Sequence, residues 1–299
     1  MTLIALLPQE IVDVVLDQLA TLCQGAHVPH NEELLNENLQ SCMQVSRSFR
    51  SHARSLLFSN ITLVVRAKES DPKSSRNLRA LLEGDPDLAK LVHAFRLNLK
   101  GTSVTHSGTS QKVLDEHLPP ILGLLPNLRK LILASLDGTT GWGGFNDKVL
   151  AAMFKFHDLP HLRSLELFGY NLSVPVDFVA RWSTLTDLIT RGSPFDLYVN
   201  KRISMPKYIM GRPLAQLTSL HLLTNFGGLA ILLDEGNRAI LRGLISLEAD
   251  IYGQRDWAML WKVMQCDCTM VQNLTIRNLY SELIYSIPRE KPVTIFYLP

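Results

Sequence analysis

Cysteine is scarce in this sequence. The chain of 299 residues contains four, at Cys23, Cys42, Cys266 and Cys268. Because that number is too small for a disulfide framework, we expect a reducing compartment, the cytoplasm or the nucleus or both. The pair Cys266-Asp-Cys268 has no histidine or further cysteine at ligand spacing, so we predict no metal site.

Long apolar runs and an excess of one charge are also missing. No stretch of about 18 apolar residues occurs, so no transmembrane helix is expected. The start MTLIALLPQE lacks the basic region of a signal peptide. The chain has 30 basic and 28 acidic residues, spread along its length, and a net charge of +2. A dedicated nucleic-acid binder is usually more basic, so we expect neither nucleic acid nor membrane as a partner.

Signatures of catalysis are absent as well. The sequence has no Gly-x-Ser-x-Gly elbow, no phosphate-binding glycine loop and no His-Glu-x-x-His. GWGGFN lacks the spacing of a dinucleotide-binding loop. The nine histidines are scattered, and we interpret His157, His161 and His221 as surface or strand residues. The chain is therefore predicted to be no enzyme and to need no cofactor.

Apolar residues make up 46% of the chain, enough for a sizeable core in one large domain or in a small domain joined to a larger one. A first helix is predicted from Pro8, with apolar residues at helical spacing. A polar loop should follow at 23–33, then a second helix from about Leu39 through Arg54. Asn60–Val65 is β-branched and alternating, as expected of a strand.

The stretch SCMQVSRSFRSHARSLLF, residues 41–58, has the pattern of a basic amphipathic helix. Its apolar stripe comprises Cys42, Val45, Phe49, Ala53 and Leu56. Three arginines lie off the stripe, at Arg47, Arg50 and Arg54. Such a helix can lie on a membrane, bind nucleic acid or dock onto a partner protein, and the pattern alone does not choose among them.

The rest of the chain repeats the pattern apolar-x-x-apolar-x-apolar. Its copies begin at residues 58, 92, 128, 162, 185, 217, 244 and 271, so successive copies are 23 to 36 residues apart. Leucine-rich repeats have a period of about 20–29 residues. Several copies alternate with helical segments, although Pro119-Pro120 should break or restart one of these helices. The prediction is an α/β fold, an irregular leucine-rich-repeat solenoid with a curved parallel sheet and outer helices.

Three further features bear on this solenoid. The asparagine typical of such repeats occurs only once, at Asn225, so apolar packing rather than an asparagine ladder should hold the stack. Pro194–Pro213 is expected to form a hairpin or an insertion, and the glycine-rich Gly138–Asn146 a loop of the kind that often carries binding function. The tail VTIFYLP should add a last strand at the sheet edge.

The N-terminal part resembles the F-box, on the segments LPQEIVDVVLDQL, LQSCMQVSRSFRSHARSLLF and ITL. It is most similar to fungal F-box proteins with degenerate leucine-rich repeats. The resemblance implies an F-box at 1–58 and a repeat domain at 59–299. It also implies docking on Skp1 within a cullin–RING ubiquitin ligase, through Leu7, Pro8, Ile11, Val15, Val45, Ser46, Phe49 and Leu57. The 37 residues from Pro8 to Val45 exceed the family's usual separation, and the extra length lies in CQGAHVPHNEELLNEN.

Residues that alternate with the leucines of each strand should line the concave face of the solenoid. We predict target-binding residues there at Arg96, Lys130, Ile132, Glu166, Phe168, Ile189, Arg191, His221, Glu248 and Arg277, beside Asn98, Leu223, Asp250 and Thr275. This mixed surface suits a protein target, whose identity the sequence does not give. Its scattered cations could read a phosphorylated segment, but more often such residues are simply solvated. Two functions stay open, a ubiquitin-ligase substrate receptor and a plain interaction scaffold in which residues 7–58 cap the solenoid.

Overall fold

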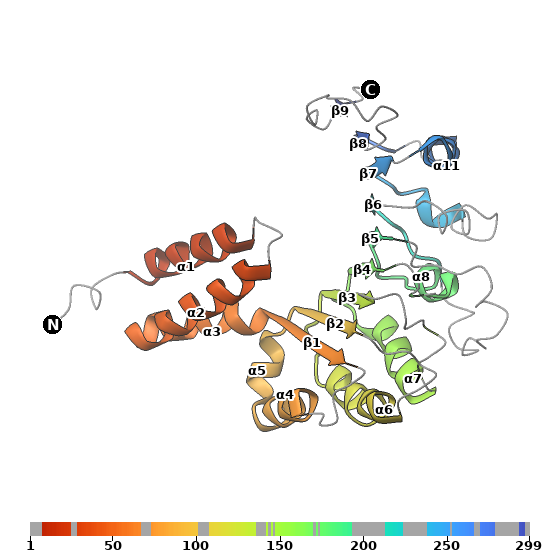
Figure 1. Ribbon diagram of the computed structural model, residues 1–299. Helices are drawn as coiled ribbons and strands as arrows, with labels where there is room; N and C mark the ends of the chain where they lie inside the picture. Colours follow the sequence, from red (N-terminus) through yellow and green to blue (C-terminus); the bar gives the residue numbers. More distant parts are fainter. Residues whose placement is uncertain are drawn as a thin grey trace, which may run out of the picture.

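The computed structural model describes residues 8–24, 29–66, 73–100, 108–135, 142, 145, 147–169, 172, 174–192, 213–223, 238–251, 253–265, 270–278 and 293–296. In this part of the chain, an N-terminal helical unit leads into a single sheet covered by helices on one face (Figure 1). The fold is α/β, as predicted. None of the described helices is long and apolar enough to cross a membrane.

The helical unit consists of α1 (Gln9–Gln24), α2 (Pro29–Val45) and α3 (Arg47–Ser59). The prediction of one helix from Leu39 through Arg54 is therefore wrong. Ser46 has an extended backbone (φ −158°, ψ 172°), and its hydroxyl accepts the N–H of Phe49 at 3.3 Å. It ends α2 and caps α3, because a serine oxygen satisfies an N–H that the first helical turn leaves open. The predicted loop at 23–33 is also too long, since α2 begins at Pro29.

A small core holds the three helices together. Its buried side chains are Val12, Leu16, Leu39 and Ala53. Partly buried apolar residues pack around them, at Leu19, Cys42, Met43, Phe49, Leu56 and Leu57. The break at Ser46 turns Val45 out of the predicted stripe, so that this valine is exposed while the other four stripe residues face the core.

Within the described residues, the sheet contains nine strands in the order of the sequence. They are β1 (Asn60–Arg66), β2 (Ala94–Lys100), β3 (Lys130–Ser135), β4 (Ser164–Phe168), β5 (Asp187–Arg191), β6 (Ser219–Leu223), β7 (Ser246–Ile251), β8 (Asn273–Asn278) and β9 (Val293–Phe296). Neighbouring strands are parallel from β1 to β8. The predicted last strand is present, and it runs antiparallel to β8.

The predicted copies of the apolar pattern align in register. One row across the sheet consists of Ile61, Phe95, Leu131, Leu165, Leu188, Leu220, Leu247 and Leu274. From Phe95 to Leu247 these side chains are fully buried, and they belong to one continuous core beneath the helices. The repeating pattern thus sets both the register and the buried face, because a slip of one residue would expose every leucine.

Backbone hydrogen bonds repeat at the strand entrances. The carbonyl oxygen of His93 accepts the N–H groups of Arg129 and Lys130, at 2.7 and 3.0 Å. The carbonyl of Arg129 accepts those of Arg163 and Ser164, at 3.0 and 3.1 Å, and the entrances of β5 to β8 repeat the arrangement. These bonds link successive units together without side chains; Asn225 lies outside the described residues.

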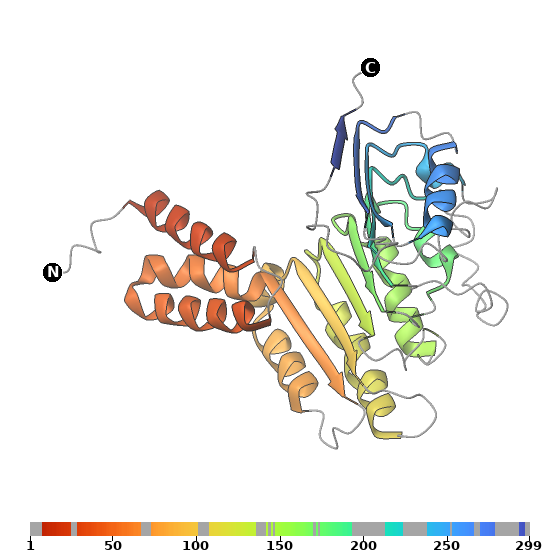
Figure 2. The same ribbon diagram turned by 45° about the horizontal axis from the view of Figure 1, so that its top comes forward.

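Helices cover one face of the sheet (Figure 2). Their bounds are α4 (Lys73–Gly84), α5 (Pro86–Leu91), α6 (Gly108–Gly123), α7 (Asp147–Lys155), η3 (Phe156–Asp158), α8 (Val176–Ala180), η6 (Arg238–Leu241) and α11 (Gln254–Gln265). The expectation that Pro119-Pro120 breaks a helix is wrong, since α6 runs through both. Each proline costs about 3 kcal/mol in a helix interior, and burial of Leu118, Ile121 and Leu122 offsets this cost, at about 1.5–3 kcal/mol each.

An aromatic cluster fills the space under α7 and α8. Trp142 and Phe145 are buried in it, although they belong to the glycine-rich segment that was expected to be a binding loop. His157 is 3% exposed and stacks on Trp182 with ring centroids 5.2 Å apart, so its assignment as a surface or strand residue is wrong. His161 is exposed, as predicted. Pro194–Pro213 lies outside the described residues except for its last proline.

Candidate functional site

The helical unit carries an apolar surface that faces away from its own core. Ile11 and Val15 on α1 are 48% and 53% exposed, and Val45 at the end of α2 is 49% exposed. Val14, also exposed, lies beside Ile11 and Val15 at helical spacing and was not predicted. Clustered apolar side chains of this kind mark a surface that another molecule can cover.

The structure divides the residues that the sequence assigns to adaptor docking. Pro8 is exposed, like Ile11, Val15 and Val45, whereas Phe49 and Leu57 pack against the small core and Ser46 caps α3. Leu7 lies outside the described residues. Four of the eight are thus surface residues, and three are half-buried residues with a packing or capping role in the unit itself.

The exposed residues gather toward one end of the helical unit. The first turn of α1 and the junction of α2 with α3 both lie at the end away from the sheet (Figure 1). Ile11 and Val45 belong to these parts and Pro8 directly precedes α1, whereas Leu57 is in the last turn of α3, next to β1. The surface at the far end is therefore free of the sheet and its helices.

Two of the three arginines in this unit make contacts within the chain. Arg50 Nε donates to the carbonyl of Met43 at 3.1 Å, and Arg54 pairs with Asp85 beside α5. Arg47 is exposed. These arginines hold the ends of helices, so they do not form a continuous basic face of the kind that lipid headgroups or phosphates require.

His52 fixes α1 against α3. Its Nε2 lies 2.8 Å from Asp17 Oδ1 and its Nδ1 lies 3.5 Å from Asp13 Oδ1. The two carboxylates stand at opposite nitrogens of the ring, so they do not converge on one point as metal ligands must. In the described part of the chain no group of three histidine, cysteine, aspartate or glutamate side chains could hold a metal ion. Cys266 and Cys268 lie outside it.

The second candidate surface is the helix-free face of the sheet. The central row of this face consists of Thr62, Arg96, Ile132, Glu166, Ile189, His221, Glu248 and Thr275. Phe168, Arg191 and Arg277 lie on one side of this row, and Lys130 on the other. All ten residues predicted to bind a target therefore lie on this one face, which we call the open face.

Glu166 is the centre of an ionic cluster on β3, β4 and β5. Its side chain is 10% exposed, and Lys130 Nζ lies 3.0 Å from its Oε2. Arg191 Nε lies 3.4 Å from Oε1 without hydrogen-bond geometry. Two cations share one carboxylate, so the cluster has a net charge of +1.

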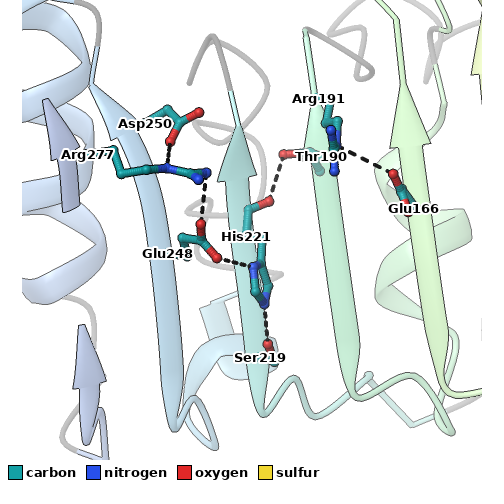
Figure 3. Close-up of polar contacts among 8 residues, drawn as sticks. All are labelled: Glu166, Thr190, Arg191, Ser219, His221, Glu248, Asp250 and Arg277. Carbon is teal, nitrogen blue, oxygen red and sulfur yellow. Dashed lines mark hydrogen bonds and ion pairs between the residues drawn. The ribbon is translucent and has the colours of Figure 1, made fainter. Parts of the chain in front are cut away.

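A second network joins β6, β7 and β8 (Figure 3). His221 Nδ1 is 2.6 Å from Glu248 Oε2, and its Nε2 is 2.9 Å from Ser219 Oγ. Arg277 contacts Glu248 Oε1 at 2.8 Å and Asp250 Oδ1 at 2.6 Å. With neutral His221 this network has a net charge of −1. Ser219 was not among the predicted target-binding residues. It lies two residues before His221 on β6, so the alternation that identified His221 also places Ser219 on the open face.

Ser219, His221 and Glu248 stand in the order hydroxyl, imidazole, carboxylate that activates a serine nucleophile. Acyl transfer also needs donors for the oxyanion. The N–H of Ser219 is already bonded to the carbonyl of Thr186 at 3.0 Å, and Asp187 is the register partner of Ser219. A carboxylate beside the nucleophile opposes a developing negative charge. We therefore interpret the three residues as a network that orients His221, not as a catalytic triad.

Comparison of the chain with protein-family models, with curated proteins and with solved structures gives no match.

Proposed function

We propose that this chain is the substrate receptor of a Skp1–cullin–RING ubiquitin ligase. In this proposal residues 1–58 are an F-box, and residues 59–299 form a leucine-rich-repeat solenoid that holds a target protein on its open face. The receptor contributes no catalytic residue. It raises the effective concentration of the target near a ubiquitin-loaded enzyme.

One observation supports this proposal above the others. The F-box-like residues Ile11, Val15 and Val45 are exposed and apolar, and the part of the unit with Ile11 and Val45 points away from the sheet. Valine and isoleucine side chains that are half exposed in the free chain gain about 25 cal/mol per Å² when a partner covers them. Skp1 is the partner that the sequence resemblance implies.

The long separation between the F-box segments is compatible with docking. Much of the additional sequence belongs to α2, which begins at Pro29. The extra residues thus lengthen a helix in addition to a loop. They lie at the start of α2, whereas the exposed Val45 is at its end.

A scaffold without Skp1 is the second candidate. The helical unit has no linker to the sheet, because α3 ends at Ser59 and β1 begins at Asn60. Leu57 contacts the small core and Phe58 contacts the large one, so the unit also covers the first edge of the solenoid. A cap of this kind is what terminal repeats require.

Co-expression with Skp1 followed by size-exclusion chromatography tests the proposal. We expect a stoichiometric complex with the wild-type chain. Val45→Asp should weaken it by several kcal/mol, since docking would bury an unpaired charge. Because Val45 is half exposed in the free chain, this variant should fold normally. Gln40→Asp is the matched control, an exposed position on α2 outside the apolar surface.

Wild-type Skp1 binding by Val45→Asp would remove the docking assignment. A well-folded chain that never binds Skp1 would favour the scaffold.

A further inference from the structure

The open face is divided by charge. On β2 to β5 it carries the cations Arg96, Lys100, Lys130 and Arg191 against the anions Glu166 and Asp187, an excess of two positive charges. On β6 to β8 it carries Arg277 against Glu248 and Asp250, with His221 between them, an excess of one negative charge when the histidine is neutral. A bound molecule therefore meets opposite potentials at the two halves.

An apolar spot lies within the positive half. Phe168 is 37% exposed, and its register partner on β5 is Arg191. Ile189, half-buried on β5, is the register partner of Glu166. An exposed aromatic ring beside an isoleucine and an arginine is typical of an interface anchor.

The two cations that contact Glu166 keep capacity for a further anion. About a third of the side chain is exposed in Lys130 and in Arg191, 35% and 31%, whereas Glu166 between them is 10% exposed. The ammonium group of a lysine has three donors and a guanidinium has five, against one shared carboxylate here. An incoming carboxylate would meet two cations and a largely covered anion.

We propose that this patch of Lys130, Phe168, Ile189 and Arg191 binds an extended acidic segment of a partner protein, with an aliphatic side chain against Phe168 and a carboxylate on Lys130 and Arg191. The proposal rests on the proposed function in one respect, that the partner is the ligase target. The chemistry of recognition follows from charge complementarity and from the apolar spot alone.

Fluorescence anisotropy of labelled peptides tests this directly. The first probe is a peptide of glutamate and leucine with glycine–serine spacers; the second replaces each glutamate with lysine, and the third replaces each leucine with serine. We expect the first to bind the wild-type chain at least about tenfold tighter than either of the others. Its affinity should fall with added salt, because exposed charges are screened.

Glu166→Gln gives the sharpest variant. The substitution keeps the size of the side chain and removes the anion that Lys130 and Arg191 share, so the acidic probe should bind about fivefold tighter. Glu248→Gln makes the same change of charge on β7, two strands and about 10 Å from the patch residues on β5. This distance exceeds the screening length of about 8 Å in physiological salt, so the affinity should stay unchanged. Equal tightening by both variants, or none by Glu166→Gln when it is folded, would overturn the proposal.

Phe168→Ala keeps the test decisive if Glu166→Gln does not fold. In this variant the leucine probe should bind no tighter than the serine probe, and the affinity for the serine probe should equal that of the wild type. A double-mutant cycle of chain and probe measures this difference. An unchanged leucine preference contradicts the assigned anchor.

Skp1 binding, measured on the same variants, separates this inference from the proposed function. If the chain selects the acidic probe but does not bind Skp1, the result would contradict only the proposed function as a substrate receptor. Skp1 binding without selectivity for the acidic probe would contradict this inference alone.

Discussion

Arg54 in α3 and Asp85 ahead of α5 form an ion pair that joins the helical unit to the first helices beside the sheet. Asp85 is also the N-cap of α5, and its Oδ1 accepts the N–H of Leu88 at 2.9 Å. One carboxylate therefore begins a helix and holds the neighbouring unit.

Acid should weaken this joint. The backbone N–H of Leu88 is the main cause that lowers the pKa of Asp85 below 3.8; partial burial opposes the shift, and Arg54 adds to it. Because the folded pKa is the lower one, the stabilisation is present above pH 3.8 and is lost as the pH falls through the folded pKa.

Urea unfolding of the wild type and Asp85→Asn tests this sign. Asparagine also caps helices, so the variant removes the charge and keeps the cap. The wild type should be the more stable at neutral pH, and the difference should shrink in acid. Asp87→Asn, on the same helix, is the control, because Asp87 is exposed and its Oδ1 lies 2.8 Å from Lys90 Nζ. A difference that does not change with pH would contradict the role assigned to Asp85.

Leu165→Ala should destabilise the fold by roughly 2–5 kcal/mol, because it truncates a fully buried side chain in the central apolar row. Ile189→Ala, on the opposite face of the neighbouring strand, should cost less, since Ile189 is only half-buried. Thermal and urea unfolding measure both. Equal losses would mean that the helix-covered face is not the main core.

Gly169→Ala should also destabilise, for a different reason. Gly169 has φ +127°, and a Cβ there would lie 2.4 Å from the carbonyl oxygen of Ser135. A side chain in this backbone region costs about 1–3 kcal/mol, before any clash is relieved. Gly123→Ala is the control, because nothing lies within 4 Å of its added Cβ. If Gly169→Ala has the same midpoint urea concentration of unfolding as the wild type, the backbone of the turn after β4 must differ from that described.

Ser46→Ala should lower stability by about 1 kcal/mol through loss of the α3 cap. Ser46→Asn should restore it, since asparagine caps equally well. The same two variants, tested for Skp1 binding, separate capping from contact. A defect in Skp1 binding that Ser46→Asn does not rescue would show that the hydroxyl itself faces the partner.

The helical unit shows where reasoning from the sequence fails. Cys42, Val45, Phe49, Ala53 and Leu56 have the spacing of one continuous helix, and a pattern of spacing contains no information on a break between its members. The break occurs at Ser46 because its side chain caps α3, a local hydrogen bond that competes with continuation of α2. The burial of His157 is likewise invisible in its neighbours along the chain, because Phe178 and Trp182 reach it from a later element.

The spacing of apolar residues is sufficient to predict the sheet. Residues that recur as apolar-x-x-apolar-x-apolar can bury their leucines only on one face, so the strands, their register and the residues of the open face follow from spacing alone. Which polar residues meet depends on the pairing of the strands and cannot be predicted from spacing. Lys130, Glu166 and Arg191 are 25 to 36 residues apart in the chain, and parallel pairing brings them side by side. The exposure of Ile11, Val15 and Val45 also depends on the tertiary structure, because the three helices pack around the small core and leave these residues outside it.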